Sequence, residues 1–290
     1  MKEKRNVGED KYNSFRVLHF NMKKFLLTLI VALLPLLVTA QEDYWDVYMA
    51  QYDNAPGSTV LNMSVKKNAP DRRLPFICIT GVKFSDCNPD GLPNESALQD
   101  LYKIADSVKS DIDRRVKNNM VGSFTYQCER LDYFYVDDTT GLRKLLLQLY
   151  LKYFPGYAPY INIKEDRKWE AYLNFLYPNE ETFEFMQNQK VVMQLEKAGD
   201  KLDKERQVDH WLYFNTEQDR DCFIAFASKQ NYKVEAKEKT KEADHSFKLQ
   251  ISKTDKVGLA LISKTTLELR RQAFKCSGRY DGWETFVIKE

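Results

Sequence analysis

The stretch from Val208 to Phe214, VDHWLYF, places its side chains alternately on two faces with a period of two. This alternation is typical of a β-strand that buries one face. The residues expected on the buried face are Val208, His210, Leu212 and Phe214. The residues expected on the opposite face are Asp209, Trp211 and Tyr213.

The segments that follow this strand predict a β-α-β-β-α-β order. We expect helices at 216–230 and 256–276, and strands at 232–237, 246–252 and 280–289. This order is that of the ferredoxin-like fold, in which right-handed crossovers place the first and last strands side by side. Gly278 follows the second helix, where a left-handed C′ residue is common, so we expect it to end that helix.

The open face of this predicted sheet carries the most functional-looking surface of the chain. Its members are Trp211, Tyr213, Lys233, Glu235, Lys248 and Gln250. Alternatively, the helix expected at 179–198 or the part of the chain before it covers this face. The glycine of the closing Tyr-Asp-Gly-Trp-Glu segment predicts either a β-bulge or a close backbone approach, and we expect Trp211 and Trp283 to form one cluster. The candidate interaction residues are Asp209, His210, Trp211, Tyr213, Tyr280, Asp281, Gly282, Trp283 and Glu284.

Residues 41–178 predict a second α+β domain, with an antiparallel sheet and helices. Strands are expected at 45–52, 58–66, 75–84, 122–130 and 131–136, with a final strand pair within 160–176. Helices are expected at 94–118, capped by Asn94, and at 140–154. The ferredoxin-like domain then covers 179–290 and begins with Asn179, which can cap a helix that runs to about Ala198 and stops at Gly199.

Residues 1–40 predict a secretory signal peptide. Lys23 and Lys24 precede an uncharged run from Phe25 to Ala40, which ends in small residues suited to cleavage after Ala40. Met22 is then the expected start of translation, and residues 1–21 are then an upstream extension that is not translated. The run is shorter than the roughly 20 residues of a permanent membrane helix, although a retained anchor is the alternative. We therefore expect a periplasmic or secreted protein with no membrane contact after cleavage.

The five cysteines, Cys78, Cys87, Cys128, Cys222 and Cys276, match no zinc or iron–sulfur spacing. Export would permit disulfides, and the odd count leaves at least one thiol free. We favour buried, unpaired cysteines, and Cys78 with Cys87 is the pair we would test first.

Charge and motifs argue against several classes of function. The chain has 44 basic and 42 acidic residues, and residues 180–290 carry 20 of each. A polybasic nucleic-acid binder is therefore not expected, although Trp211 and Tyr213 could stack on bases. The sequence contains no phosphate-binding loop, nucleophile elbow or zinc-protease motif. We expect no enzyme activity and no cofactor or metal.

Asp209 and His210 form a sequence that resembles part of a catalytic triad. Neighbours on a strand face opposite sides, so Asp209 cannot orient the ring of His210. A buried, hydrogen-bonded histidine is the favoured interpretation. The alternative is a hydrolase that uses His210 with Asp281 or Glu284 from the adjacent strand.

The segments Arg206–Phe214 and Tyr280–Thr285 together resemble the family of regulator of ribonuclease activity B, over about residues 183–290. Residues 45–178, with Gly91-Leu92-Pro93 before a helix, resemble family 695 of unknown function. The first resemblance implies a ferredoxin-like fold, no catalytic residues, and inhibition of a cytoplasmic endoribonuclease by protein–protein binding. The leader instead favours an exported, non-enzymatic module that binds an unknown protein partner. A cytoplasmic ribonuclease regulator is the alternative function.

Overall fold

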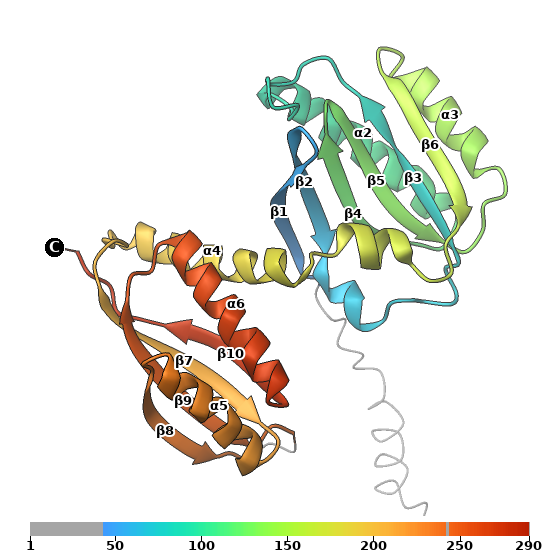
Figure 1. Cartoon of the computed structure of the whole chain (residues 1–290). Helices are drawn as coiled ribbons and strands as arrows, with labels where there is room; N and C mark the ends of the chain where they lie inside the picture. Colours follow the sequence, from blue (N-terminus) through green and yellow to red (C-terminus); the bar gives the residue numbers. More distant parts are fainter. Residues whose placement is uncertain (1–42, 242–243, 290) are drawn as a thin grey trace, which may run out of the picture. The chain divides into compact units, whose positions relative to one another are not determined.

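A computed structural model describes residues 43–241 and 244–289, which form two antiparallel sheets with helices (Figure 1). The mixed α+β class predicted from the sequence is confirmed. The predicted leader, with Met22 and the cleavage point at Ala40, lies outside the described residues.

The N-terminal sheet has six strands in the order β1-β2-β4-β5-β3-β6. Its strands are β1 Trp45–Tyr52, β2 Ala55–Asn62, β3 Phe76–Lys83, β4 Asn118–Tyr126, β5 Glu129–Val136 and β6 Ala158–Glu165. Its helices are η2 Met63–Lys67, α2 Glu95–Arg115, α3 Leu142–Tyr153 and η3 Ala171–Leu176. All neighbouring strands in this sheet pair antiparallel.

Both faces of this sheet bury apolar side chains. On one face α2 and α3 contribute Leu101, Val108 and Leu146 to a core with Phe134. On the other face η3 contributes Tyr172 and Leu176. The sheet is therefore a central layer, as the apolar runs along its inner strands require.

Two helices begin where the sequence predicts them. Asn94 Oδ1 accepts a hydrogen bond of 2.9 Å from the amide of Ala97 at the start of α2. Asn179 Oδ1 accepts one of 2.8 Å from Thr182 at the start of α4, Glu180–Lys197. These caps satisfy amides that have no partner within the helix. Gly199, with a φ of +80°, follows α4 as expected.

Three predictions for the N-terminal domain are wrong. The strand expected at 122–130 is interrupted by a turn at 127–128, where β4 ends and β5 begins. The segment 160–176 contains one strand, β6, followed by the π-helix η3. Apolar residues over such a short run do not distinguish a strand from a helix, and here the aromatic side chains of the segment fill the core. β2 begins at Ala55, earlier than expected, because the turn lies at residues 53–54 and Ala55 already pairs with Tyr52.

The C-terminal sheet has the order β10-β7-β9-β8 and carries α5 and α6 on one face (Figure 1). Its strands are β7 Arg206–Phe214, β8 Lys233–Lys239, β9 Phe247–Asp255 and β10 Gly278–Glu284. Its helices are α5 Glu217–Lys229 and α6 Leu259–Lys275. The first and last strands are neighbours, as the ferredoxin-like order predicts.

Gly278 does not end α6 in the left-handed conformation, so that prediction is wrong. Ser277 takes this conformation, with a φ of +53°, and Gly278 is the first residue of β10. A Cβ on Gly278 would lie 2.3 Å from the ring of Phe214. Glycine is needed here because a buried ring packs against the backbone.

The cysteines form two disulfides, Cys87–Cys128 and Cys222–Cys276. The preference for unpaired cysteines and the proposed pair of Cys78 with Cys87 are therefore wrong. Cys78 is the free, buried cysteine, and burial raises the pKa of its thiol to about 12. The sequence could not reveal the pairs because their partners are 41 and 54 residues apart.

Candidate functional site

Strand β7 divides its side chains between the two faces of the C-terminal sheet. Val208, Leu212 and Phe214 are fully buried, as the alternation predicts. His210 lies on the same face and is 1% exposed, with its Nδ1 2.9 Å from the hydroxyl of Tyr280. Burial lowers the pKa of His210 to about 3 and raises the pKa of Tyr280. His210 is thus a neutral core side chain.

The closing strand β10 contains the predicted bulge. Tyr280 pairs with Leu212 and Gly282 pairs with Trp211, so Asp281 is the extra residue. Gly282 has a φ of +151°, a backbone conformation that favours glycine. After the bulge, Trp283 pairs with His210 and therefore lies on the helix-covered face.

Trp211 and Trp283 do not form the expected cluster. Trp283 is buried with Val208 and Ile262, and its Nε1 donates a hydrogen bond of 2.8 Å to Asn188 of α4. Trp211 neighbours His210 on β7 and therefore points to the opposite face. The bulge decides this separation because it shifts the alternation of β10 by one residue.

The face of the sheet opposite the helices, here called the open face, is organised in three rows across β10, β7, β9 and β8. The first row contains Glu284, Asp209, Ser252 and Lys233. The second row contains Gly282, Trp211, Gln250 and Ala236. The third row contains Arg279, Tyr213, Lys248 and Glu238. The half-buried indole of Trp211 therefore lies between a glycine and an amide, with charged side chains in the flanking rows.

The polar groups of the open face are held in place by one another. Asp209 accepts hydrogen bonds of 3.1 Å from the side-chain amides of Gln207 and Gln250. The guanidinium of Arg279 lies 5.3 Å from the centre of the Tyr213 ring, within cation–π range. These contacts fix the side chains around Trp211 and lower the entropy that would be lost on binding.

A bulge in the edge strand β8 adds an acidic group to the same face. Ser252 Oγ donates a hydrogen bond of 2.6 Å to Glu235, and Lys233 lies 3.0 Å from the same carboxylate. The hydrogen bond from Ser252 and the contact with Lys233 lower the pKa of Glu235. Glu235 and Lys233 are thus paired on this face.

Helix α4 packs on the helix-covered side of the C-terminal sheet and leaves the open face uncovered. Asn188 bonds to Trp283 and also donates a hydrogen bond of 2.7 Å to Thr266 of α6. Glu184 of α4, which is 2% exposed, pairs with Arg270 of α6. These roles of α4 have no signal in the sequence, because Glu and Asn are mostly exposed in proteins and the burial of Glu184 and Asn188 follows from packing against α6.

The structure does not bring a hydrolytic triad together. His210 lies in the core, whereas Glu284 pairs with Asp209 on the open face. Asp281 is exposed and lies 3.5 Å from Arg279. Neither carboxylate has a hydrogen bond to His210 among the described residues, and a buried imidazole with this pKa is a poor general base near neutral pH.

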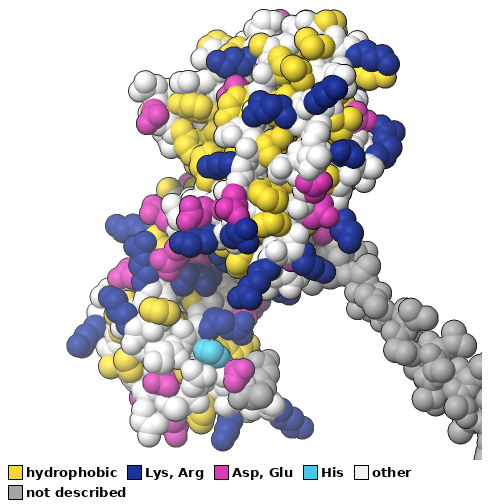
Figure 2. Space-filling view, turned by 90° about the vertical axis from the view of Figure 1, so that its right-hand side faces the viewer, with side chains coloured by type: hydrophobic (Ala, Val, Ile, Leu, Met, Phe, Trp, Pro, Cys, Tyr) yellow, Lys and Arg dark blue, Asp and Glu magenta, His cyan; other side chains and the backbone are white. Residues whose placement is uncertain are grey.

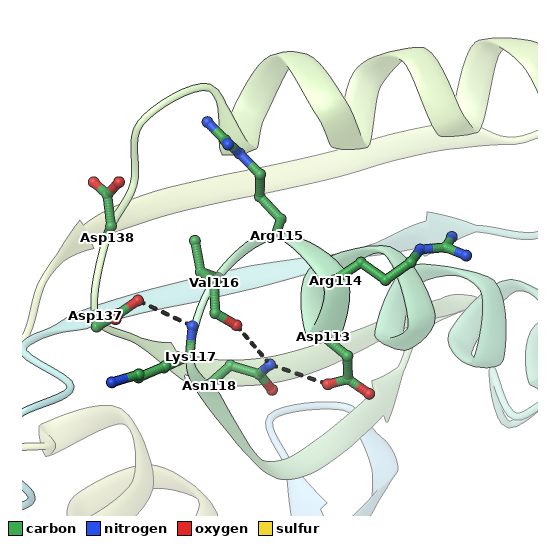
Figure 3. Close-up of a pocket in the computed structure, with 8 residues that line it drawn as sticks. All are labelled: Asp113, Arg114, Arg115, Val116, Lys117, Asn118, Asp137 and Asp138. Atoms are coloured by element: carbon green, nitrogen blue, oxygen red, sulfur yellow. Dashed lines mark hydrogen bonds between the residues drawn. The ribbon is translucent and has the colours of Figure 1, made fainter.

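The N-terminal domain has an open hollow where α2 ends and β4 begins (Figure 3). Its polar groups satisfy one another: Asn118 Nδ2 donates to Asp113, and the amide of Lys117 donates to Asp137. The side chain of Arg115 donates a hydrogen bond of 2.8 Å to the carbonyl of Thr140. Three acidic and three basic residues line this hollow, so it offers no concentrated charge to a ligand.

Within residues 43–241 and 244–289, no group of three or more His, Cys, Asp or Glu side chains is arranged to hold a metal ion. No helix in the same ranges has the length and apolar character needed to cross a bilayer. Figure 2 shows basic and acidic side chains interspersed on one face of the molecule, with hydrophobic groups between them.

These features define a two-domain α+β protein whose C-terminal domain has the ferredoxin-like strand order and an ordered, aromatic open face. Residues 185–285 match the family model of regulator of ribonuclease activity B. Residues 43–177 match the model of a family of unknown function, DUF695. Both resemblances seen in the sequence, and their order along the chain, are confirmed.

Comparison with curated proteins found no match. Among solved structures, an unknown protein from Galdieria sulphuraria aligns with 9% identity, over 73% of this chain and 99% of that chain. The TM-score of 0.20 is too low to support a common fold.

Proposed function

We propose that this chain is a non-enzymatic, exported regulatory module that binds a protein partner through the open face of its C-terminal sheet. The observation that carries the proposal is the position of Trp211 in the middle row of that face. Gly282 and Ala236 lie in the same row, so a partner side chain can approach the indole. Tryptophan and tyrosine are common among the residues that dominate binding energy at protein interfaces.

The match to a family of regulators of ribonuclease activity supports a role in protein binding. The name of that family describes regulation of an enzyme, a role that protein binding can perform. Paired charges around an aromatic centre also suit a protein interface, in which a polar rim surrounds a more apolar middle.

Export is supported by the apolar run from Phe25 to Ala40 and by the two disulfides. Disulfides form and persist in oxidising compartments and are rare in the cytosol. Fractionation of cells that express the whole chain, followed by mass spectrometry of its N-terminus, tests this part. A mature start near Gln41 in the periplasmic or secreted fraction is the expected result.

The binding surface is tested with the mature protein as bait against the fraction in which it is found. We expect a partner that is retained by the wild type and lost from Trp211→Ala. The matched control is Phe274→Ala, which removes an exposed aromatic side chain from α6 on the other side of the sheet. A partner lost equally from both variants would contradict the open-face proposal.

The alternative function is a cytoplasmic regulator that inhibits a ribonuclease by protein–protein binding. The family match favours it, and a full-length chain recovered from the cytoplasm with its leader uncleaved would support it. In that case, adding the purified chain to an endoribonuclease of the same cell should slow RNA cleavage. No change in cleavage rate, together with a cleaved leader, would remove this alternative.

A further inference from the structure

The two sheets have four edge strands, and three of them carry features that oppose pairing with another chain. β6 contains Pro159 and ends in Lys164 and Glu165. β8 has the charged sequence KVEAKEK and a bulge. β10 has a bulge and three charged side chains. Prolines, bulges and edge charges are the usual means by which proteins prevent edge-to-edge association.

Strand β1 has none of these features apart from one charge. Its eight residues, WDVYMAQY, pair with β2 in an unbroken register and contain no proline. No other described strand pairs with its outer edge. The single charged residue, Asp46, forms a salt bridge of 2.5 Å with Lys190 of α4. The outer amide of Val47 donates a hydrogen bond of 3.0 Å to the carboxylate of Asp46. The outer backbone groups of Met49 and Gln51 have no hydrogen-bond partner among the described residues, so these groups are available for a further strand.

The same strand exposes an apolar row. Trp45, Val47 and Met49 are 39%, 53% and 49% exposed and alternate along one face of the strand. On the other face Tyr48 is buried, and its hydroxyl donates a hydrogen bond of 3.0 Å to the carbonyl of Leu176. The strand is therefore anchored on one face while its apolar row is exposed on the other.

We propose that the outer edge of β1 pairs antiparallel with β1 of a second copy of this chain. A two-fold pairing that places Tyr48 opposite its own copy also places Val47 opposite Met49, apolar against apolar. The same register places Asp46 opposite Ala50, so no like charges meet. Closed two-fold contacts of this kind are the commonest form of self-association, and in this register the apolar residues of the strand meet one another while no like charges do.

The contact is one strand wide, so we expect a dimer that dissociates on dilution. It uses a different surface from the open face of the C-terminal sheet and does not depend on the proposed function. The test uses mature protein purified from cells that express the whole chain, examined by sedimentation over a wide concentration range. Hydrogen exchange of the segment 45–52 is followed at the same concentrations.

We expect the dimer fraction and the protection of segment 45–52 to rise together with concentration, while segment 158–165 of β6 stays unchanged. Val47→Lys should abolish the dimer without changing the thermal midpoint, because the side chain is exposed. Tyr160→Lys, on the edge strand β6, is the matched control and should leave the dimer intact. A monomer at every concentration, a dimer that survives Val47→Lys, or protection that does not depend on concentration would overturn the proposal.

Discussion

The indole nitrogen of Trp283 donates a hydrogen bond of 2.8 Å to the side-chain oxygen of Asn188, 95 residues earlier in the chain. This bond ties the closing strand to α4, whose Asn188 is 1% exposed and also bonded to Thr266. Helix α4 is therefore part of the C-terminal domain's packing, and the family match, which begins at residue 185, includes all of the helix after its first five residues.

Trp283→Ala should lower the free energy of unfolding by about 3–5 kcal/mol, because it removes a large buried side chain and leaves Asn188 without its donor. Trp211→Ala should change stability little, since its ring is half-buried on the open face. Urea denaturation of both variants measures the difference. If Trp211→Ala unfolds the domain as severely as Trp283→Ala, the open face is core and the proposed binding surface is wrong.

Gly282→Ala should destabilise the protein by about 1–3 kcal/mol, because a residue with a Cβ would have to adopt a φ of +151°. Nothing lies within 4 Å of the added carbon, so the cost comes from the backbone. Gly282→Val should be at least as damaging. Gly156→Ala is the matched control, since its added carbon also meets open space but no positive φ is required. Equal thermal midpoints for Gly282→Ala and Gly156→Ala would contradict this account of the bulge.

The free energy of unfolding should fall in acid because His210 is protonated more easily in the unfolded chain. Its folded pKa is lowered by burial to about 3 from a usual value of 6.5, so the unfolded chain binds a proton first as the pH falls. The contribution of neutral His210 to the free energy of unfolding is fully present above pH 6.5. It decreases by at most about 1.4 kcal/mol per pH unit as the pH falls toward 3.

The variant His210→Asn isolates this effect from the titration of the carboxylates. Its stability deficit relative to the wild type should shrink as the pH is lowered from 7 to 4, because only the wild type loses the histidine contribution. Urea denaturation at several pH values measures the deficit. A deficit that stays constant over this range would show that His210 is not held neutral by burial.

Thiol counting should find one free cysteine in the denatured, unreduced protein and none that reacts in the native protein. Cys78 supplies the single thiol, and burial both hides it and raises its pKa to about 12. Cys78→Ala should reduce the denatured count to zero. Five thiols in protein taken directly from the cell would mean that both disulfides are absent there, and would count against export.

The sequence by itself determined the elements that depend on local rules. Asn94 and Asn179 cap their helices, and the alternation of Val208, His210 and Leu212 assigns the buried face of β7. The ferredoxin-like order followed from the same patterns. Caps, turns and strand periodicity depend on neighbours a few residues apart, so a single chain contains the necessary information.

Only the tertiary structure decided which distant groups meet. The bulge at Asp281 separates Trp211 from Trp283, and the folded sheet, not the cysteine spacing, brings Cys87 to Cys128. The residues 171–176 became a π-helix because their aromatic side chains fill the core beneath the six-stranded sheet. Such outcomes depend on packing between elements far apart in the sequence, where a one-residue shift in register moves a side chain from core to solvent.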